Sequence, residues 1–220
     1  MCEFLFFVLL FFCYMKIQRF DMKHIPLILD VVTPLWSPPI GSDKFKRFSV
    51  EYIVRNNIFE NEYRFQLEDD DFLSAAFFAR KGDVNLADAW FEENFTFFTD
   101  DLKIASDMSR TYLKLMDKKT FSLMNDDDIK LSLFVSRKSG FGKVLLDSIC
   151  KQLYKEGYKN LYLWTDCECN WQWYVKHDFT LVNEDVYEPF SNEKEEYKTY
   201  IFKKKIENYR QVFNCVLEFS

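Results

Sequence analysis

Two glycines separated by one residue lie among basic side chains in this chain. Gly140 and Gly142 are two of only five glycines in 220 residues, and Arg137, Lys138 and Lys143 flank them. Glycine lets backbone N–H groups approach an anion closely, and a helix N-terminus adds partial positive charge. The segment therefore predicts a site for a phosphate or pyrophosphate group; a tight turn without a ligand is the alternative. The segment completes neither the Rossmann dinucleotide-binding fingerprint, G-x-G-x-x-G, nor the Walker A phosphate-binding loop, G-x-x-x-x-G-K-[ST].

A strand and a helix must position this turn. Residues 129–135 (IKLSLFV) are apolar at alternate positions, which predicts a strand. Residues 141–156 place apolar side chains at i, i+3, i+4 and i+7, which predicts an amphipathic helix that Gly157 ends. A second buried strand is predicted at residues 160–164. The turn thus belongs to a strand–turn–helix–strand unit.

The remaining pattern predicts an α/β domain. Further strands are expected at residues 16–20, 63–67, 72–80, 120–124, 179–186 and 198–203. Helices are expected at residues 22–33, 45–57 and 170–177, with two more within 83–119 that interrupt the sheet as an insertion. Asp21 is expected to cap the first helix and Pro34 to end it.

The turn and a later segment resemble the GCN5-related N-acetyltransferase (GNAT) superfamily. Residues 137–142 (RKSGFG) match its R/Q-x-x-G-x-G/A signature, and residues 174–179 (YVKHDF) are similar to its Y-x-x-x-G-F segment. The element order over residues 15–204 also fits. The resemblance implies a mixed, mostly antiparallel central sheet flanked by helices, with a helical insertion at 83–119.

The resemblance also implies an activity and a set of site residues. The activity is transfer of an acetyl group from acetyl-CoA to a primary amine by direct attack in a ternary complex. Tyr174 would protonate the departing thiolate, although this chain has 12 tyrosines and a core role is the alternative. An amide near Phe134 or Val135 would polarise the thioester carbonyl, and Asn170 would contact the cofactor arm. The pyrophosphate would lie on the turn formed by Arg137, Lys138, Ser139, Gly140, Phe141, Gly142 and Lys143.

Three departures from the family pattern bear on these roles. Asp178 stands where the family has glycine, and aspartate tolerates left-handed backbone better than most residues. Asn170 lies closer to the tyrosine than usual, and the turn after Val135 is about three residues shorter than the common pattern. The general base is not identified: residues 126–128 and 68–71 supply carboxylates, but both segments are also typical of exposed acidic turns.

Composition narrows the class of partner and the compartment. The net charge of −6 argues against a nucleic-acid binder and favours a cationic acceptor, either an amine-bearing small molecule or a protein amine. The six cysteines fit neither a disulfide framework nor a zinc site, since Cys167 and Cys169 have only His177 as a nearby third ligand. We therefore expect reduced thiols, no metal and a cytoplasmic protein. Oligomeric state stays open between monomer and homodimer.

The first residues form a separate hydrophobic extension. Residues 4–12 (FLFFVLLFF) are too short to span a membrane as a helix, and no basic segment precedes them as in a signal peptide. We expect residues 1–14 not to belong to the natural chain, which would begin at Met15; a short membrane-surface anchor is the alternative. The catalytic domain is expected at 15–205, with the tail 206–220 unassigned. A non-catalytic acyl-CoA-binding sensor or interaction module is the alternative function.

Overall fold

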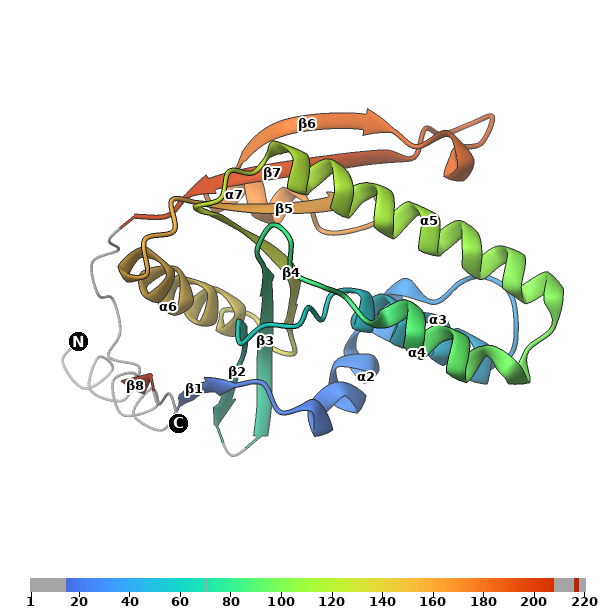
Figure 1. Ribbon diagram of the computed structural model, residues 1–220, viewed down its shortest axis with the longest axis horizontal. Helices are drawn as coiled ribbons and strands as arrows, with labels where there is room; N and C mark the ends of the chain where they lie inside the picture. Colours follow the sequence, from blue (N-terminus) through green and yellow to red (C-terminus); the bar gives the residue numbers. More distant parts are fainter. Residues whose placement is uncertain (1–14, 70, 208–215, 218–220) are drawn as a thin grey trace.

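The computed structural model describes residues 15–69, 71–207 and 216–217 (Figure 1). Within these ranges, strands form one sheet in the order β6-β7-β5-β4-β3-β2-β1-β8. Adjacent strands are antiparallel except for the pairs β1–β8 and β4–β5, which confirms the expected mixed, mostly antiparallel sheet. The strands are β1 (Lys16–Arg19), β2 (Arg64–Asp69), β3 (Asp71–Ala79), β4 (Asp128–Ser136), β5 (Asn160–Asp166), β6 (Thr180–Val186), β7 (Lys198–Lys205) and β8 (Val216–Leu217).

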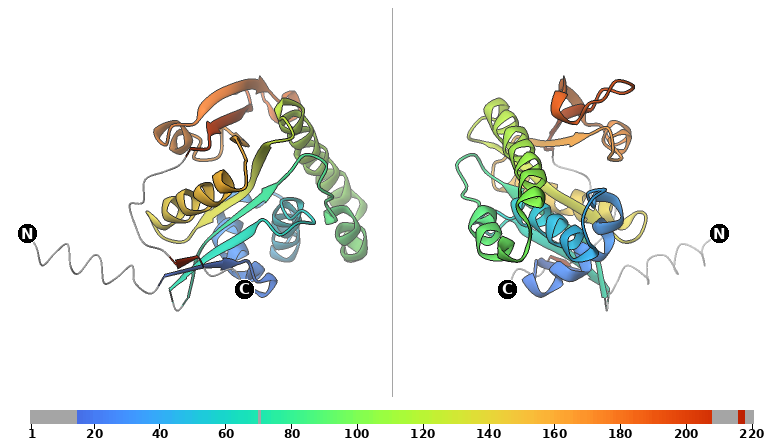
Figure 2. Two further views of the ribbon diagram at one scale, coloured as in Figure 1. Left: turned by 60° about the vertical axis from the view of Figure 1, so that its left-hand side comes forward. Right: turned by 90° about the vertical axis from the view of Figure 1, so that its right-hand side faces the viewer.

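Helices cover both faces of this sheet. On one face α6 packs on β2, β3 and β4 through buried leucines and Ile149, whereas α2 packs on the opposite face of β3 and β4 (Figures 1 and 2). A third apolar cluster joins α3, α4 and α5 to β5 and β7. The α-helices are α2 (Ile25–Trp36), α3 (Asp43–Asn56), α4 (Ala87–Asn94), α5 (Asp100–Leu123), α6 (Phe141–Lys155) and α7 (Gln172–Lys176). Short 3-10 turns lie at Met22–His24, Phe95–Phe97 and Glu188–Phe190.

The first helix ends later than the sequence predicts. Asp21 accepts a hydrogen bond from the Lys23 N–H at 3.0 Å, so it caps a 3-10 turn, and α2 begins only at Ile25. The helix then continues through Pro34 to Trp36. Proline removes one hydrogen bond to the carbonyl of Asp30, and water can satisfy that carbonyl because Asp30 is exposed.

The strand predicted at residues 120–124 is wrong. Helix α5 runs on to Leu123, and the Thr120 hydroxyl donates to the carbonyl of Met116 at 2.8 Å. This bond satisfies the hydroxyl within the helix, so the β-branched residue stays helical although it is fully buried. Two α-helices, α4 and α5, therefore occupy the connection from β3 to β4.

No described helix is long and apolar enough to cross a membrane. The hydrophobic run at residues 4–12 lies outside the described residues, as does most of the tail from 208 onward.

Candidate functional site

Strands β4 and β5 pair over a short length and then separate. Their parallel ladder contains three pairs and ends at Lys130 and Tyr162. Two residues beyond Lys130, β4 carries an extra residue, Ser132, opposite the junction of Phe77 and Phe78 on β3. A bulge bends the strand that contains it, which accounts for the divergence of β4 from β5. The result is a gap between two strands that point the same way.

The edge of β4 beyond Lys130 presents free backbone groups to this gap. The N–H of Arg137 donates to the carbonyl of Leu73 on β3 at 2.8 Å. Backbone groups of alternate residues point to opposite edges of a strand, so the groups of Val135 also face β3 and those of Phe134 face the gap. In the described chain, no strand pairs with β4 on that side after Lys130. Of the two predicted thioester contacts, the Phe134 amide is the one that the register directs into the gap.

The turn from β4 to α6 leaves a helix N-terminus uncapped. Gly140 precedes the helix with a φ of +88°, and no described side chain caps the first turn. The N–H groups of Phe141, Gly142 and Lys143 therefore have no intrahelical acceptor. Lys138 and Ser139 are exposed in the turn, so the Lys138 charge is available nearby. These donors fit an anion.

The two glycines of the turn are needed for different reasons. Gly140 adopts a positive φ that L side chains disfavour, and the space around it is open. Gly142 lies in the first turn of α6, where an added Cβ would be 2.9 Å from Cζ of Phe134 and 3.2 Å from Cβ of Ser136. One glycine shapes the turn, and the other lets the helix approach β4.

Two basic residues of the turn are engaged by carboxylates. The Arg137 guanidinium pairs with Asp71 on β3 at 3.0 Å, and its backbone N–H belongs to the β3–β4 ladder. Lys143 pairs with Asp147 one helical turn later. Arg137 is thus bonded on the side of β4 away from β5, whereas Lys143 stays exposed on the first turn of α6.

Tyr174 lies in α7, beside the gap. Its ring packs edge-on against Phe179 at 5.4 Å, and that of its neighbour Trp173 contacts the Phe134 ring at 5.3 Å. Burial raises the pKa of Tyr174 well above its usual value, and the Cys169 thiol nearby adds to this effect. The phenol is therefore protonated at neutral pH. In the described ranges, no hydrogen-bond partner of its hydroxyl is found.

The residues around Tyr174 bear out one local prediction. Asp178 adopts a φ of +64°, the left-handed backbone expected for an aspartate in the place of glycine. Asn170 is exposed, and its carbonyl accepts the N–H of Trp173 at 3.1 Å. His177 stacks on Trp173 at 3.8 Å and bonds its carbonyl through Nδ1. No cluster of metal-ligating side chains is found among the described residues.

The candidate carboxylates at residues 126–128 lie far from the gap. Asp128 begins β4, is fully buried and accepts hydrogen bonds from Asn125 and Asn160. Asp127 pairs with Lys159. Phe134 lies six residues further along the strand, roughly 20 Å away. Both carboxylates therefore lie at the start of β4, at the opposite end of the strand from Phe134. In the second candidate segment, residues 68–71, Asp71 forms the ion pair with Arg137 described above.

A buried carboxylate that the sequence reading missed lies at the end of β5. Asp166 is only 7% exposed, and the Tyr112 hydroxyl of α5 donates to it at 3.1 Å. The sequence signal was an aspartate two residues after the apolar run of residues 160–164. Its contact with Tyr112 depends on the placement of helix α5 over β5, which the sequence does not show.

No protein-family model and no curated protein matches the chain. Solved structures do match its fold. The ribosomal-protein-S18-alanine N-acetyltransferase of Escherichia coli aligns with a TM-score of 0.51 and 14% identity over 90% of this chain and 98% of that one. A putative acetyltransferase of the GNAT family from Desulfovibrio desulfuricans gives 0.51 and 11% over 88% and 99%. The C-terminal condensation domain of Ebony, solved with beta-alanyl-dopamine, gives 0.52 and 7% over 87% and 99%.

Proposed function

We propose that this chain, which has the fold of the GCN5-related N-acetyltransferases, transfers an acetyl group from acetyl-CoA to a primary amine. The proposal is carried by one observation: the free edge of β4 lies along the gap to β5 and ends at the uncapped N-terminus of α6. Coenzyme A has an extended pantetheine arm that ends in a pyrophosphate, and the two parts match the strand edge and the helix N-terminus.

The donor set fits the proposed co-substrate. The amides of Ser139, Gly140, Phe141, Gly142 and Lys143 would hold the pyrophosphate, with charge from Lys138 and Lys143. Arg137 would contribute only its positive charge, because its guanidinium and its backbone N–H are bonded to residues of β3. The edge of β4 would pair with the pantetheine arm, and Asn170 would contact it from the other side. Acetyl-CoA supplies an activated acetyl group on a thiol leaving group.

The chain's own residues would then serve two functions in the transfer. The Phe134 N–H would donate to the thioester carbonyl oxygen, where negative charge develops as the amine attacks. Tyr174 would donate its proton to the departing sulfur. Burial keeps the phenol protonated, so the proton donor brings no charge next to the thiolate. Attack would be direct, within a ternary complex.

We also propose that α4 and α5 cover the acceptor side of the gap and contribute to the choice of amine. Helix α5 packs on β5 and β7 through Tyr112, Leu113 and Met116, on the face opposite α6. The described cysteines, Cys150, Cys167 and Cys169, are free thiols, which is compatible with a protein of the reducing cytoplasm.

Thermal unfolding with acetyl-CoA tests the binding half of the proposal. Saturating acetyl-CoA should raise the melting temperature of the wild-type chain. The double substitution Lys138→Glu/Lys143→Glu should reduce that shift, whereas Lys155→Glu, at the other end of α6, should leave it unchanged. If acetyl-CoA produces no shift in the wild type, the proposal is wrong.

Free-thiol release with a panel of amines tests the catalytic half. Tyr174→Phe should lower kcat by about 100-fold or more and leave acetyl-CoA affinity intact. Tyr154→Phe, an exposed tyrosine on α6, is the matched control and should behave as wild type. Binding of acetyl-CoA without thiol release in the presence of any amine would instead indicate a non-catalytic acyl-CoA-binding module.

A further inference from the structure

Asp166 presents a buried carboxylate on the face of the sheet that α5 covers. One oxygen accepts the hydroxyl of Tyr112 at 3.1 Å, and the other accepts the N–H of Glu168 at 3.2 Å. None of the ion pairs within the described residues includes Asp166. An ionised carboxylate is costly to bury without a cation, so this one is suited to a cation that a ligand brings.

The carboxylate lies opposite the proposed reaction centre. The ladder between β4 and β5 ends at Lys130 and Tyr162. Phe134 is four residues past that point on β4, and Asp166 is four residues past it on β5. The extra residue Ser132 shortens the advance of β4 by about one residue, so Phe134 lies close to the level of Asp166 across the gap. The proposed role of the Phe134 amide places the acetyl group between them.

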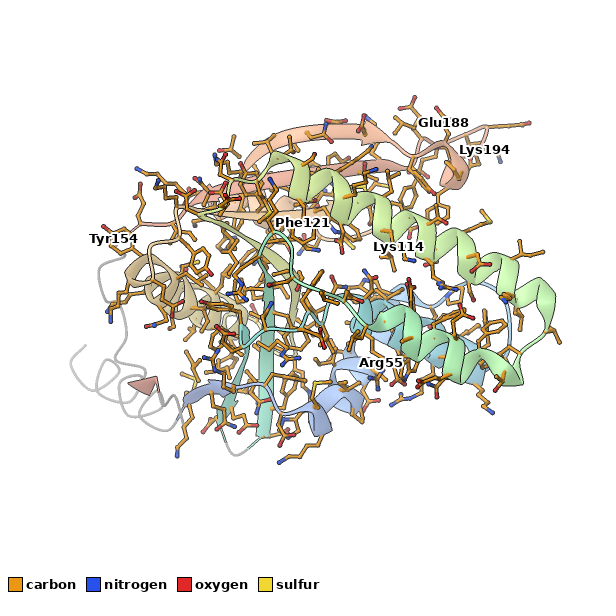
Figure 3. All side chains as sticks on the ribbon, viewed as in Figure 1. Arg55, Lys114, Phe121, Tyr154, Glu188 and Lys194 are labelled. Atoms are coloured by element: carbon orange, nitrogen blue, oxygen red, sulfur yellow. The ribbon has the colours of Figure 1, made fainter. Side chains whose placement is uncertain are left out.

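Aromatic rings surround this position. The Tyr112 ring contacts four others, at centroid distances between 4.9 and 5.8 Å: Trp164, Tyr187, Phe190 and Tyr197. These four are half-buried and come from β5 and from the connection between β6 and β7. Figure 3 shows that connection, marked by Glu188 and Lys194, beside α5, marked by Lys114. Ring faces attract organic cations and also bury apolar surface.

We propose that Asp166 binds the acceptor's ammonium group and then takes its proton, and that the acceptor is a primary amine with an aromatic or other apolar body. This inference rests on the proposed acetyl transfer. One N–H bond of the ammonium breaks and its proton passes to the Asp166 carboxylate. The freed nitrogen lone pair forms a bond to the acetyl carbon. The carbon–sulfur bond breaks, and the sulfur receives the Tyr174 proton. The amide nitrogen gives its second proton, through water, to the Tyr174 phenolate, and Asp166 releases its proton to solvent.

The groups that face Asp166 leave it as the candidate base. Burial raises the pKa of Tyr112 and of Tyr197, and the Asp166 charge adds to both shifts, so these hydroxyls donate only. Burial raises the pKa of the Cys169 thiol to about 12. Glu168 is the second carboxylate close by, and its pKa is raised by partial burial and by the charges of Asp166 and Glu195. The Glu168 residue is exposed to solvent, however, whereas Asp166 is buried among the rings.

The substitution Asp166→Asn keeps the shape of the side chain and removes its charge. With 2-phenylethylamine as acceptor, kcat/KM should fall at least 100-fold, while the acetyl-CoA melting shift stays as in wild type. Glu184→Gln, an exposed carboxylate on β6 that pairs with Lys198, is the matched control. A kcat/KM within threefold of wild type for Asp166→Asn would overturn the proposal. So would a wild-type preference for butane-1,4-diamine over 2-phenylethylamine.

A second variant keeps the proposal testable if Asp166→Asn does not fold. Tyr112→Phe keeps the ring but removes one donor that holds the carboxylate, so it should lower kcat/KM for 2-phenylethylamine by about tenfold. Tyr52→Phe, which loses a similar bond to Asp88, is its control and should leave kcat/KM unchanged. A wild-type kcat/KM in Tyr112→Phe would contradict the role of Asp166.

Calorimetry without turnover separates the two proposals. If acetyl-CoA does not bind the wild-type chain, the proposed function fails on its own. Titration of 2-phenylethylammonium into wild type and Asp166→Asn then still tests the ammonium site. Binding that the substitution abolishes supports the site, and equal or absent binding in both proteins overturns it.

Discussion

Lys130 of β4 and Asp117 of α5 form an ion pair in which the lysine side chain is completely buried and the aspartate is 13% exposed. The ammonium also lies 5.0 Å from the ring centroids of Phe59 and Phe121. The same Asp117 oxygen accepts the Trp164 indole N–H at 2.6 Å. This pair joins α5 to the sheet at the point where β4 and β5 separate.

The two halves of this ion pair should respond unequally to substitution. Asp117→Asn leaves a fully buried ammonium unpaired and should lower the free energy of unfolding by about 3–5 kcal/mol. Lys130→Met removes the buried charge and leaves an aspartate that still has the indole donor and some contact with water. Lys130→Met should therefore lower the free energy of unfolding far less than Asp117→Asn does. Urea unfolding measures both, and equal losses would contradict this assignment of the burial cost.

Gly142→Ala should destabilise the first turn of α6. The new methyl group would meet Phe134 and Ser136 at the distances given above, and overpacking of this kind costs about 1–3 kcal/mol. Adding Phe134→Leu should recover part of the loss by vacating the space. A double-mutant cycle on thermal unfolding measures the coupling, and strictly additive effects would show that Phe134 is not the obstacle.

Asp178→Gly should stabilise the chain. The φ of +64° costs an L residue about 1–2 kcal/mol, although aspartate pays less than most and glycine loses backbone entropy. A net gain of about 0.5–1 kcal/mol corresponds to a rise of about 1–4 °C in Tm. Asp178→Ala at the same exposed site should lower Tm. A fall for both variants would mean that the aspartate side chain itself supports the turn.

Cys150 and Cys169 should resist alkylation at neutral and mildly alkaline pH. Burial is the main cause that raises the pKa of each thiol to about 12. At pH 8 the thiolate fraction is then about one in ten thousand, against about a quarter for an ordinary cysteine. Because the pKa is raised, reactivity should grow about tenfold per pH unit until the thiol ionises. Peptide mapping after iodoacetamide treatment measures this, with the urea-unfolded chain as reference; similar rates in both would contradict it.

The turn at the centre of the site could be predicted because its residues act locally. The alternating run before it gave β4, the periodic run after it gave α6, and Gly157, with a φ of +95°, ends that helix as expected. The left-handed backbone of Asp178 could be expected for the same reason, since it depends on the type of that residue alone.

Contacts between distant segments could not be read from the sequence. Thr120 favours a strand by propensity, yet it is fully buried in α5, where its hydroxyl bonds the Met116 carbonyl. The ion pair of Arg137 with Asp71 and the contact of Tyr112 with Asp166 each join residues more than fifty positions apart. The direction of the Val135 and Phe134 amides likewise depends on the register with β3.

The connection through α4 and α5 also bears on the order in which the chain folds. Strands β2 and β3 meet through a tight hairpin, but Ala79 and Lys130, which pair between β3 and β4, are about fifty residues apart in sequence. Loop-closure entropy must be overcome before such distant pairings are rewarded, so β4 should join late. In refolding experiments the helical circular-dichroism signal should therefore return before acetyl-CoA binding does, because the gap cannot exist until β4 has paired.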